Sequence, residues 1–127
     1  MESYEPALSE GNIRIAHEVV GTIAGLAATE VEGVAGMSGG VVDGLTELLK
    51  KKNLTKGVKV EVGQRQTAVD LYIVLKYGAK MPETAYKIQE NVKRAIESMT
   101  GLEVVEVNVH IQGVEFKTEE EEETRVR

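Results

Sequence analysis

The stretch MPETAYKIQENVKRAIESMTGLEVVEVNVHI, residues 81–111, contains both hydrophobic periods from which the fold can be read. In its first part the spacing places apolar residues on one face of a helix, in the series Ala85, Ile88, Val92, Ile96 and Met99. Pro82 suits the first turn of that helix, and Gly101 suits a left-handed cap at its end. After the glycine the spacing changes to alternation, which is typical of a strand, in the series Val105, Val107, Val109 and Ile111.

Two more strands are expected before this helix. Residues 58–62 and 69–77 both alternate between apolar and other side chains, and the polar residues 63–66 between them can turn the chain. These segments predict a β-hairpin. Its second strand also carries apolar side chains on the opposite face, which favours a central strand or a partly covered outer surface: Ala68, Tyr72 and Val74.

The N-terminal part predicts a short strand followed by a helix. Residues 11–16 alternate, with Ile13 and Ile15 on one face, and residues 17–31 change to helical spacing. Several glycines between positions 33 and 40 then indicate a flexible connection. Beyond them, residues 42–49 return to helical spacing, which predicts a short extra helix.

The order strand, helix, short helix, strand, strand, helix, strand is typical of a split βαβ fold. We therefore expect an α+β two-layer sandwich: a small, mainly antiparallel sheet of three or four strands, with two main helices on one face and a short extra helix after the first helix. A three-stranded sheet with residues 11–16 detached is the alternative. We expect a flexible leader over 1–10, a single α+β domain over 11–116 and a disordered acidic tail over 117–127.

Composition restricts the class of protein. The 127 residues include no cysteine, which excludes disulfides, a thiolate nucleophile and a cysteine zinc site. No apolar run reaches the ~20 residues of a membrane span, and the start lacks the regions of a signal peptide, so we expect a cytoplasmic protein. The net charge of −6 falls to −4 without residues 117–127, whose five Glu outweigh two Arg and one Lys. Because this body repels phosphate backbones, nucleic acid is not an expected partner.

One face of the predicted sheet is a candidate site. On this face, the last strand carries three polar residues: Asn108, His110 and Gln112. We expect them to lie beside Tyr72 and Val74 of the neighbouring strand. We interpret these five residues as a partner surface. The alternative is a small acid-base group, because the carboxylate of Asp70 would hold the imidazole of His110 and raise its pKa.

A second candidate is a basic patch for an anionic surface, formed by Lys50, Lys51, Lys52 and Lys56. The alternative is a solvated helix end and loop. The two histidines, His17 and His110, have no other ligand-type residue at metal-binding spacing, and the carboxylates are scattered. We therefore expect no catalytic residues, no metal and no cofactor.

A family resemblance is carried by short blocks spread over residues 11–116. They include Gly11-x-Ile13-x-Ile15-Ala16-x-Glu18-Val19-Val20, then Gly33-Val34, Gly57-Val58-Lys59-Val60, Val69-Asp70-Leu71-Tyr72, Tyr77-Gly78 and Pro82. They end in the segment from Asn91-Val92 to Val114. In order and spacing these blocks resemble the alkaline shock protein family, envelope stress response proteins of Gram-positive and related bacteria.

The resemblance implies a non-enzymatic cytoplasmic protein that supports cell-envelope homeostasis under stress. It also implies a homo-oligomer and a membrane-embedded anchoring partner, and it supplies no catalytic residues. Two functions follow. One is an interaction protein that self-associates and docks to a membrane-bound partner through the sheet face. The other is a small-ligand or lipid-metabolism regulator, which requires a pocket between the helices and the sheet.

Overall fold

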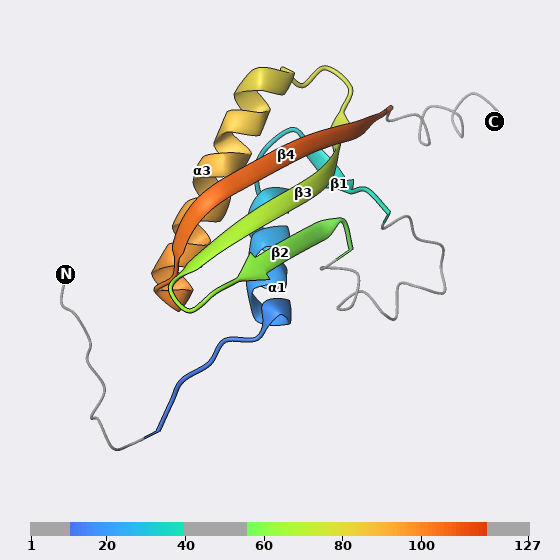
Figure 1. Cartoon of the computed structure of the whole chain (residues 1–127). Coiled ribbons are helices and arrows are strands. Elements are labelled where there is room, and N and C mark those ends of the chain that lie inside the picture. The colour runs from blue at the N-terminus through green and yellow to red at the C-terminus, as the bar shows by residue number, and fades with distance from the viewer. Residues whose placement is uncertain (1–10, 40–55, 117–127) are drawn as a thin grey trace.

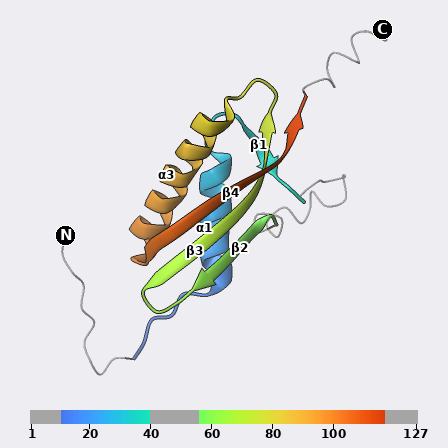
Figure 2. The ribbon, with the colours of Figure 1, turned by 45° about the horizontal axis from the view of Figure 1, so that its top comes forward.

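A computed structural model of the chain describes residues 11–39 and 56–116. The elements follow the order α1 (His17–Thr29), β1 (Val34–Met37), β2 (Val58–Val62), β3 (Gln66–Lys76), α3 (Met81–Thr100) and β4 (Glu103–Glu115). Both helices lie on the same face of a four-stranded sheet (Figures 1 and 2). The predicted α+β two-layer sandwich is therefore confirmed.

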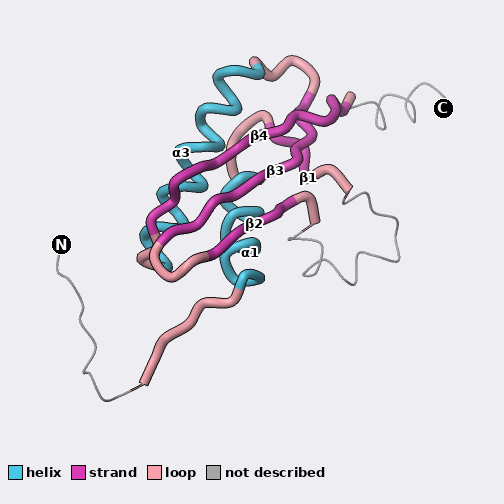
Figure 3. Tube along the Cα trace, in the orientation of Figure 1, coloured by secondary structure: helices cyan, strands magenta, loops and turns pink. Residues whose placement is uncertain are grey.

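The sheet is built around β3, the strand that pairs with all three others. β4 runs parallel to β3, while β1 and β2 are antiparallel to it, so the sheet is mixed and mainly antiparallel. β1 and β2 share one edge of β3 end to end: Tyr72 O accepts from Ser38 N, and Tyr72 N donates to Gly57 O, each at 2.7 Å. Figure 3 shows the two short strands following one another along β3.

The predicted first strand over residues 11–16 is wrong. These residues lie outside the sheet; Ile13 is 83% exposed, and only Ile15 packs against the core. The fourth strand is instead β1, within the stretch that we expected to be a flexible connection. β1 has only four residues, which is too short for a readable period. It forms because β2 pairs with β3 only as far as Leu71 and leaves Ile73–Leu75 open to a second partner.

The core lies between the helices and the sheet. Its fully buried members include Leu71, Ile73 and Leu75 of β3 and Ile88, Val92 and Ile96 of α3. The prediction that Met99 belongs to this core is wrong, because its side chain is 71% exposed. The chain turns at Gly101, whose φ is +79°, and the next residue, Leu102, is buried at 7% exposure. Leu102 therefore takes the place in the core that the helical period assigned to Met99.

Three α3 side chains form hydrogen bonds that hold the backbone of the first half of β4. They lie at the edge of this strand that does not pair with β3. Glu97 Oε2 accepts from Val104 N at 2.9 Å and from Lys93 Nζ at 3.1 Å. Gln89 Nε2 donates to Val107 O at 3.0 Å. These contacts tie the strand to the helix that precedes it in sequence.

Several predicted features lie outside the described residues: the leader over 1–10, the short helix over 42–49, three of the four patch lysines, and the acidic tail over 117–127.

Candidate partner-binding surface

The two faces of β3 meet different surroundings. Val69, Leu71, Ile73 and Leu75 point toward the helices and are fully buried. The alternate residues, from Ala68 to Val74, point to the other side and are half-buried. Both helices cover the first face, so the second has no helix over it in the described structure (Figure 2). We call this second side the outer face.

The parallel register of β3 and β4 brings the predicted polar residues together on the outer face. Asp70 lies opposite Asn108, and Tyr72 lies opposite His110. Asp70 Oδ1 accepts a hydrogen bond from Asn108 Nδ2 at 3.1 Å and lies 3.2 Å from His110 Nε2. One carboxylate oxygen therefore holds two side chains of the neighbouring strand.

Tyr72 adds an aromatic contact to this group. Its ring stacks on the His110 ring, with centroids 4.5 Å apart and an interplanar angle of 11°. The ammonium of Lys59, from β2, lies 5.6 Å from the Tyr72 centroid, within the range of a cation–π interaction. Three strands thus contribute to one arrangement, which we call the outer-face cluster: Lys59, Asp70, Tyr72, Asn108 and His110.

The sequence analysis did not assign Lys59 to this surface. The signal that could have found it is the hairpin register, because Lys59 is the direct partner of Asp70 across the β2–β3 pair. Only the length of the turn fixes that register. Gly63 N donates to Gln66 O at 2.8 Å and closes the turn between the residues that we expected to form it.

The two remaining predicted surface residues lie at the far end of this face. Val74 is half-buried and faces Gly113, whereas Gln112 is exposed and has no register partner because the pairing shifts there. Simple alternation placed Gln112 in line with His110. A β-bulge inserts one extra residue at this point, so Gly113 takes the position beside Val74.

The surroundings of the Asp70–His110 pair favour contact over catalysis. Both side chains are well exposed, at 38% and 41%. A cleft of about 380 Å³ lies in the described structure at the start of α3, and no member of the outer-face cluster lines it. An acid-base pair needs a held substrate within hydrogen-bond reach, and neither residue of this pair lines that cleft.

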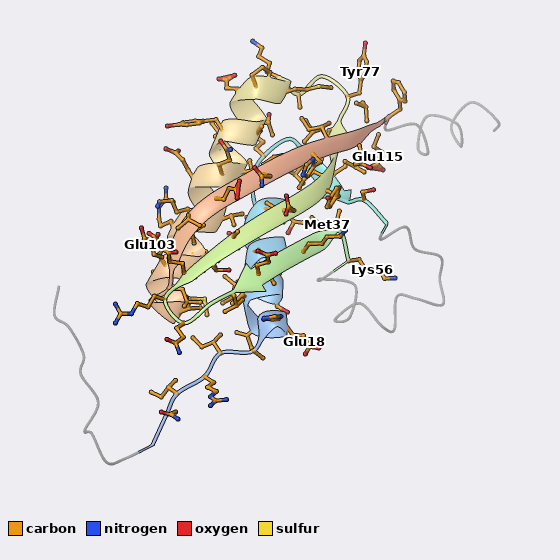
Figure 4. The ribbon with its side chains drawn as sticks, in the orientation of Figure 1. Glu18, Met37, Lys56, Tyr77, Glu103 and Glu115 are labelled. Atoms are coloured by element: carbon orange, nitrogen blue, oxygen red, sulfur yellow. The ribbon has the colours of Figure 1, made fainter. Side chains whose placement is uncertain are left out.

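The basic patch can be located only in part. Lys56 is exposed immediately before β2, near Met37 of β1 (Figure 4). Lys50, Lys51 and Lys52 lie outside the described residues. Over residues 11–39 and 56–116, the structure holds no group of three or more metal-ligating side chains. Within the same ranges, neither helix is long and apolar enough to cross a membrane.

Comparison with known proteins assigns the chain to a family. Residues 5–116 match the model of the alkaline shock protein 23 family, which is described as having a cell envelope-related function. This chain belongs to the alkaline shock protein family. The resemblance inferred from the sequence blocks is therefore confirmed, and the match begins six residues earlier than those blocks.

Curated relatives of this family member come from Gram-positive bacteria. The uncharacterized protein YqhY of Bacillus subtilis is 41% identical over 112 residues, which are 88% of this chain and 83% of YqhY. The uncharacterized protein YloU of the same organism is 40% identical, over 88% of this chain and 95% of YloU. A Streptococcus pyogenes protein named stress response regulator gls24 homolog is 38% identical, over 87% of this chain and 62% of its own length.

Solved structures give a weaker likeness. A structure of MamM-CTD covers 79% of this family member and all of its own chain, with a TM-score of 0.49 and 18% identity. A likeness at that level supports no conclusion about this chain.

Proposed function

We propose that this protein acts in cell-envelope homeostasis under stress as a non-enzymatic cytoplasmic interaction protein. It self-associates and docks to a membrane-bound partner through the outer face of its sheet. The observation that carries the proposal is the outer-face cluster on a sheet surface that neither α1 nor α3 covers. The family description and the name of the streptococcal relative support the envelope and stress setting.

The physical properties of the cluster suit recognition. Tyr72 and His110 are already stacked, and Asp70 already holds both Asn108 and His110. A partner therefore meets side chains that lose little conformational freedom on binding. Aromatic residues supply much of the contact energy in protein interfaces.

This proposal fits the described structure better than a ligand pocket between helices and sheet. The side chains that line that interface include Leu71, Ile73, Ile88, Val92 and Ile96, all with no exposed surface. Close packing of this kind leaves no room for a lipid or small metabolite without large rearrangement. The regulator hypothesis gains no support from these residues.

Self-association is tested by measuring mass in solution with light scattering over a range of protein concentrations. We expect the wild-type chain to form an oligomer and Tyr72→Glu to shift it toward the monomer. The matched control is Tyr86→Glu, because Tyr86 is a 59% exposed tyrosine on α3, away from the outer face. A wild-type chain that stays monomeric at high concentration contradicts the proposal, and equal effects of the two variants place the interface elsewhere.

Docking is tested by capture from a native membrane fraction on immobilised protein. We expect a membrane-bound protein to be retained by the wild type and by Tyr86→Glu, and lost with Tyr72→Glu. Retention by all three proteins alike would exclude the outer face as the docking surface.

The acid-base alternative has its own test. An NMR titration of His110 in the wild type and in Asp70→Asn reports how strongly the carboxylate holds the imidazole. An identical titration of His110 in the two proteins contradicts the acid-base reading, because the carboxylate would then have no hold on the imidazole.

A further inference from the structure

A cleft of about 380 Å³ opens at the end of the molecule where β3 ends and α3 begins. Three separate segments line it: the loop after α1 with Gly33, the end of β3 with Lys76 and Tyr77, and the first turns of α3 with Lys80 and Thr84. Figure 4 labels Tyr77 at this end, far from the β2 end that carries Lys56. The cleft shares no residue with the outer-face cluster.

Thr84 is the buried polar group of this cleft. The residue is only 7% exposed, yet its hydroxyl forms no hydrogen bond with any described residue. In the same residues, no side-chain oxygen that is sealed from solvent lacks a partner. The Thr84 hydroxyl is therefore not fully sealed from solvent, and Thr84 is one of the residues that line the cleft. A hydroxyl on a side chain this buried, with no partner among the described residues, can gain from a ligand able to pair with it.

Backbone donors of the α3 terminus lie beside that hydroxyl. The first hydrogen bond of the helix runs from Thr84 N to Lys80 O at 2.9 Å, so the N–H groups of Met81 and Glu83 precede it. Lys80 occupies the N-cap position and supplies no side-chain cap. Unpaired N–H groups at the start of a 20-residue helix favour an anion there.

The charges around the cleft favour the same kind of ligand. Lys76, Lys80 and Lys87 line it together with Glu32 and Glu83, which gives a net charge of +1. The net charge of the cleft lining is therefore opposite in sign to that of the whole chain, which is −6. The glutamates limit the excess, so a small, compact anion suits the cleft better than a polyanion.

The shape of the backbone keeps the cleft open. Gly33 has a φ of +102°, and a Cβ at this position would lie 3.5 Å from Thr84 Oγ1 and 3.3 Å from Ala79 Cβ. A side chain there would stand between the loop and the Thr84 hydroxyl. Glycine leaves that approach free.

We propose that this cleft binds a phosphate group, held by the Thr84 hydroxyl, the N–H group of Glu83 and the Lys80 ammonium. Phosphate supplies several acceptor oxygens on one compact anion, which matches donors that come from one helix terminus and two side chains. The group can belong to a soluble phosphorylated molecule or to a lipid headgroup. The site is independent of the outer face and of the proposed function.

The first experiment titrates inorganic phosphate into the full chain at constant ionic strength and follows backbone amide shifts by NMR. We expect saturable shifts at Glu83 and Thr84. Thr84→Val keeps the shape of the side chain and removes the hydroxyl, and we expect it to weaken binding about tenfold. Lys80→Gln is expected to weaken it about two- to fivefold.

Two matched controls accompany these variants. Ser98→Ala removes a hydroxyl at the opposite end of α3, and Lys59→Gln removes a lysine from the outer face. Both should bind phosphate like the wild type. Absence of saturable shifts in the wild type overturns the proposal, as does equal binding by Thr84→Val and the wild type.

A second experiment distinguishes the two sources of phosphate by flotation with vesicles. One set contains phosphatidylglycerol in phosphatidylcholine, and the other contains phosphatidylcholine alone. Binding to the first set that is lost in Thr84→Val assigns the site to a lipid headgroup. Saturable phosphate shifts without vesicle binding assign it to a soluble phosphorylated molecule. Vesicle binding without phosphate shifts contradicts the cleft as the site.

Discussion

The two faces of β3 belong to one strand, yet they differ in burial and in the chemical character of their side chains. Toward the helices, Leu71 and Ile73 have no exposed surface, while Tyr72 between them lies half-buried among polar groups on the outer face. The inner residues hold the layers together by removing apolar surface from water. The outer residues are already organised by their own contacts and contribute little to that core. Substitutions on the two faces should therefore separate stability from interaction.

The largest expected effect is on the inner face. Leu71→Ala should lower the free energy of unfolding by about 2 to 5 kcal/mol, because it leaves a cavity in a fully buried site. Tyr72→Glu, one residue later, should cost about 1 kcal/mol or less, since it removes one aromatic stack at a half-exposed site. Urea denaturation of both variants measures the difference. Equal losses would contradict the division between the faces.

The next effect tests where β1 and β2 meet on the edge of β3. Gly57 has a φ of +80°, and a Cβ there would lie 2.7 Å from Ser38 O and 3.0 Å from Tyr72 O. Gly57→Ala should therefore cost about 2 to 4 kcal/mol, from backbone strain and from displacement of two carbonyl groups.

The matched control for this junction is Gly78→Ala. Gly78 has a φ of +99°, but a Cβ there meets nothing within 4 Å. Only the backbone strain remains, so we expect a loss of about 1 to 2 kcal/mol by the same urea measurement. A Gly57→Ala variant no less stable than Gly78→Ala would show that the two short strands do not meet at Tyr72.

A smaller effect concerns the attachment of β4 to α3. The backbone N–H of Val104 and, next, the ammonium of Lys93 hold the pKa of Glu97 below its usual value of 4.5. A lowered folded-state pKa stabilises the protein above the unfolded value, and this contribution is lost as the pH falls through the folded value. Glu97→Gln should cost about 1 kcal/mol at pH 7.

The pH dependence gives the check on that attachment. Unfolding curves of the wild type and of Glu97→Gln should differ at pH 7 and converge as the pH falls below 4.5, where the wild-type carboxylate takes up its proton. A constant difference between the two proteins down to pH 3 would mean that the charge of Glu97 does not contribute.

The smallest effect is expected at Met99, and Ile96, a buried position of the same helical stripe, serves as its comparison. Ile96→Ala should cost about 2 to 5 kcal/mol, because Ile96 has no exposed surface. Met99→Ala should stay within about 0.5 kcal/mol, because Met99 is 71% exposed. Thermal or urea unfolding distinguishes these outcomes, and a large loss in Met99→Ala would return that residue to the core.

Much of the site could be predicted because successive side chains of a strand point to opposite faces of the sheet. The period of β3 and β4 placed Tyr72, Asn108 and His110 on one face, and the pairing of Asp70 with His110 followed from that face. Lys59 and Gln112 were harder to assign. The position of Lys59 depends on the register of the hairpin, and the position of Gln112 depends on a bulge. Neither feature can be read from the hydrophobic period of the sequence.

The cleft at the start of α3 could not be predicted at all. Gly33 and Tyr77 each belong to blocks that carry the family resemblance, but they lie far apart in sequence. Only the folded chain brings the loop after α1 against the first turns of α3. That approach places Thr84 beside Gly33 at the cleft.

The sequence by itself determined α1, the β2–β3 hairpin, α3 and β4, because each contains a hydrophobic period long enough to select one backbone conformation. It also determined the family, through the order and spacing of its blocks. The tertiary structure decided which short segment completes the sheet. Residues 11–16 and β1 are both short, and β1 forms a strand because β3 extends past β2 and offers it hydrogen-bond partners. It likewise decided that Leu102, and not Met99, fills the end of the core, since the turn at Gly101 sets which side chain reaches it.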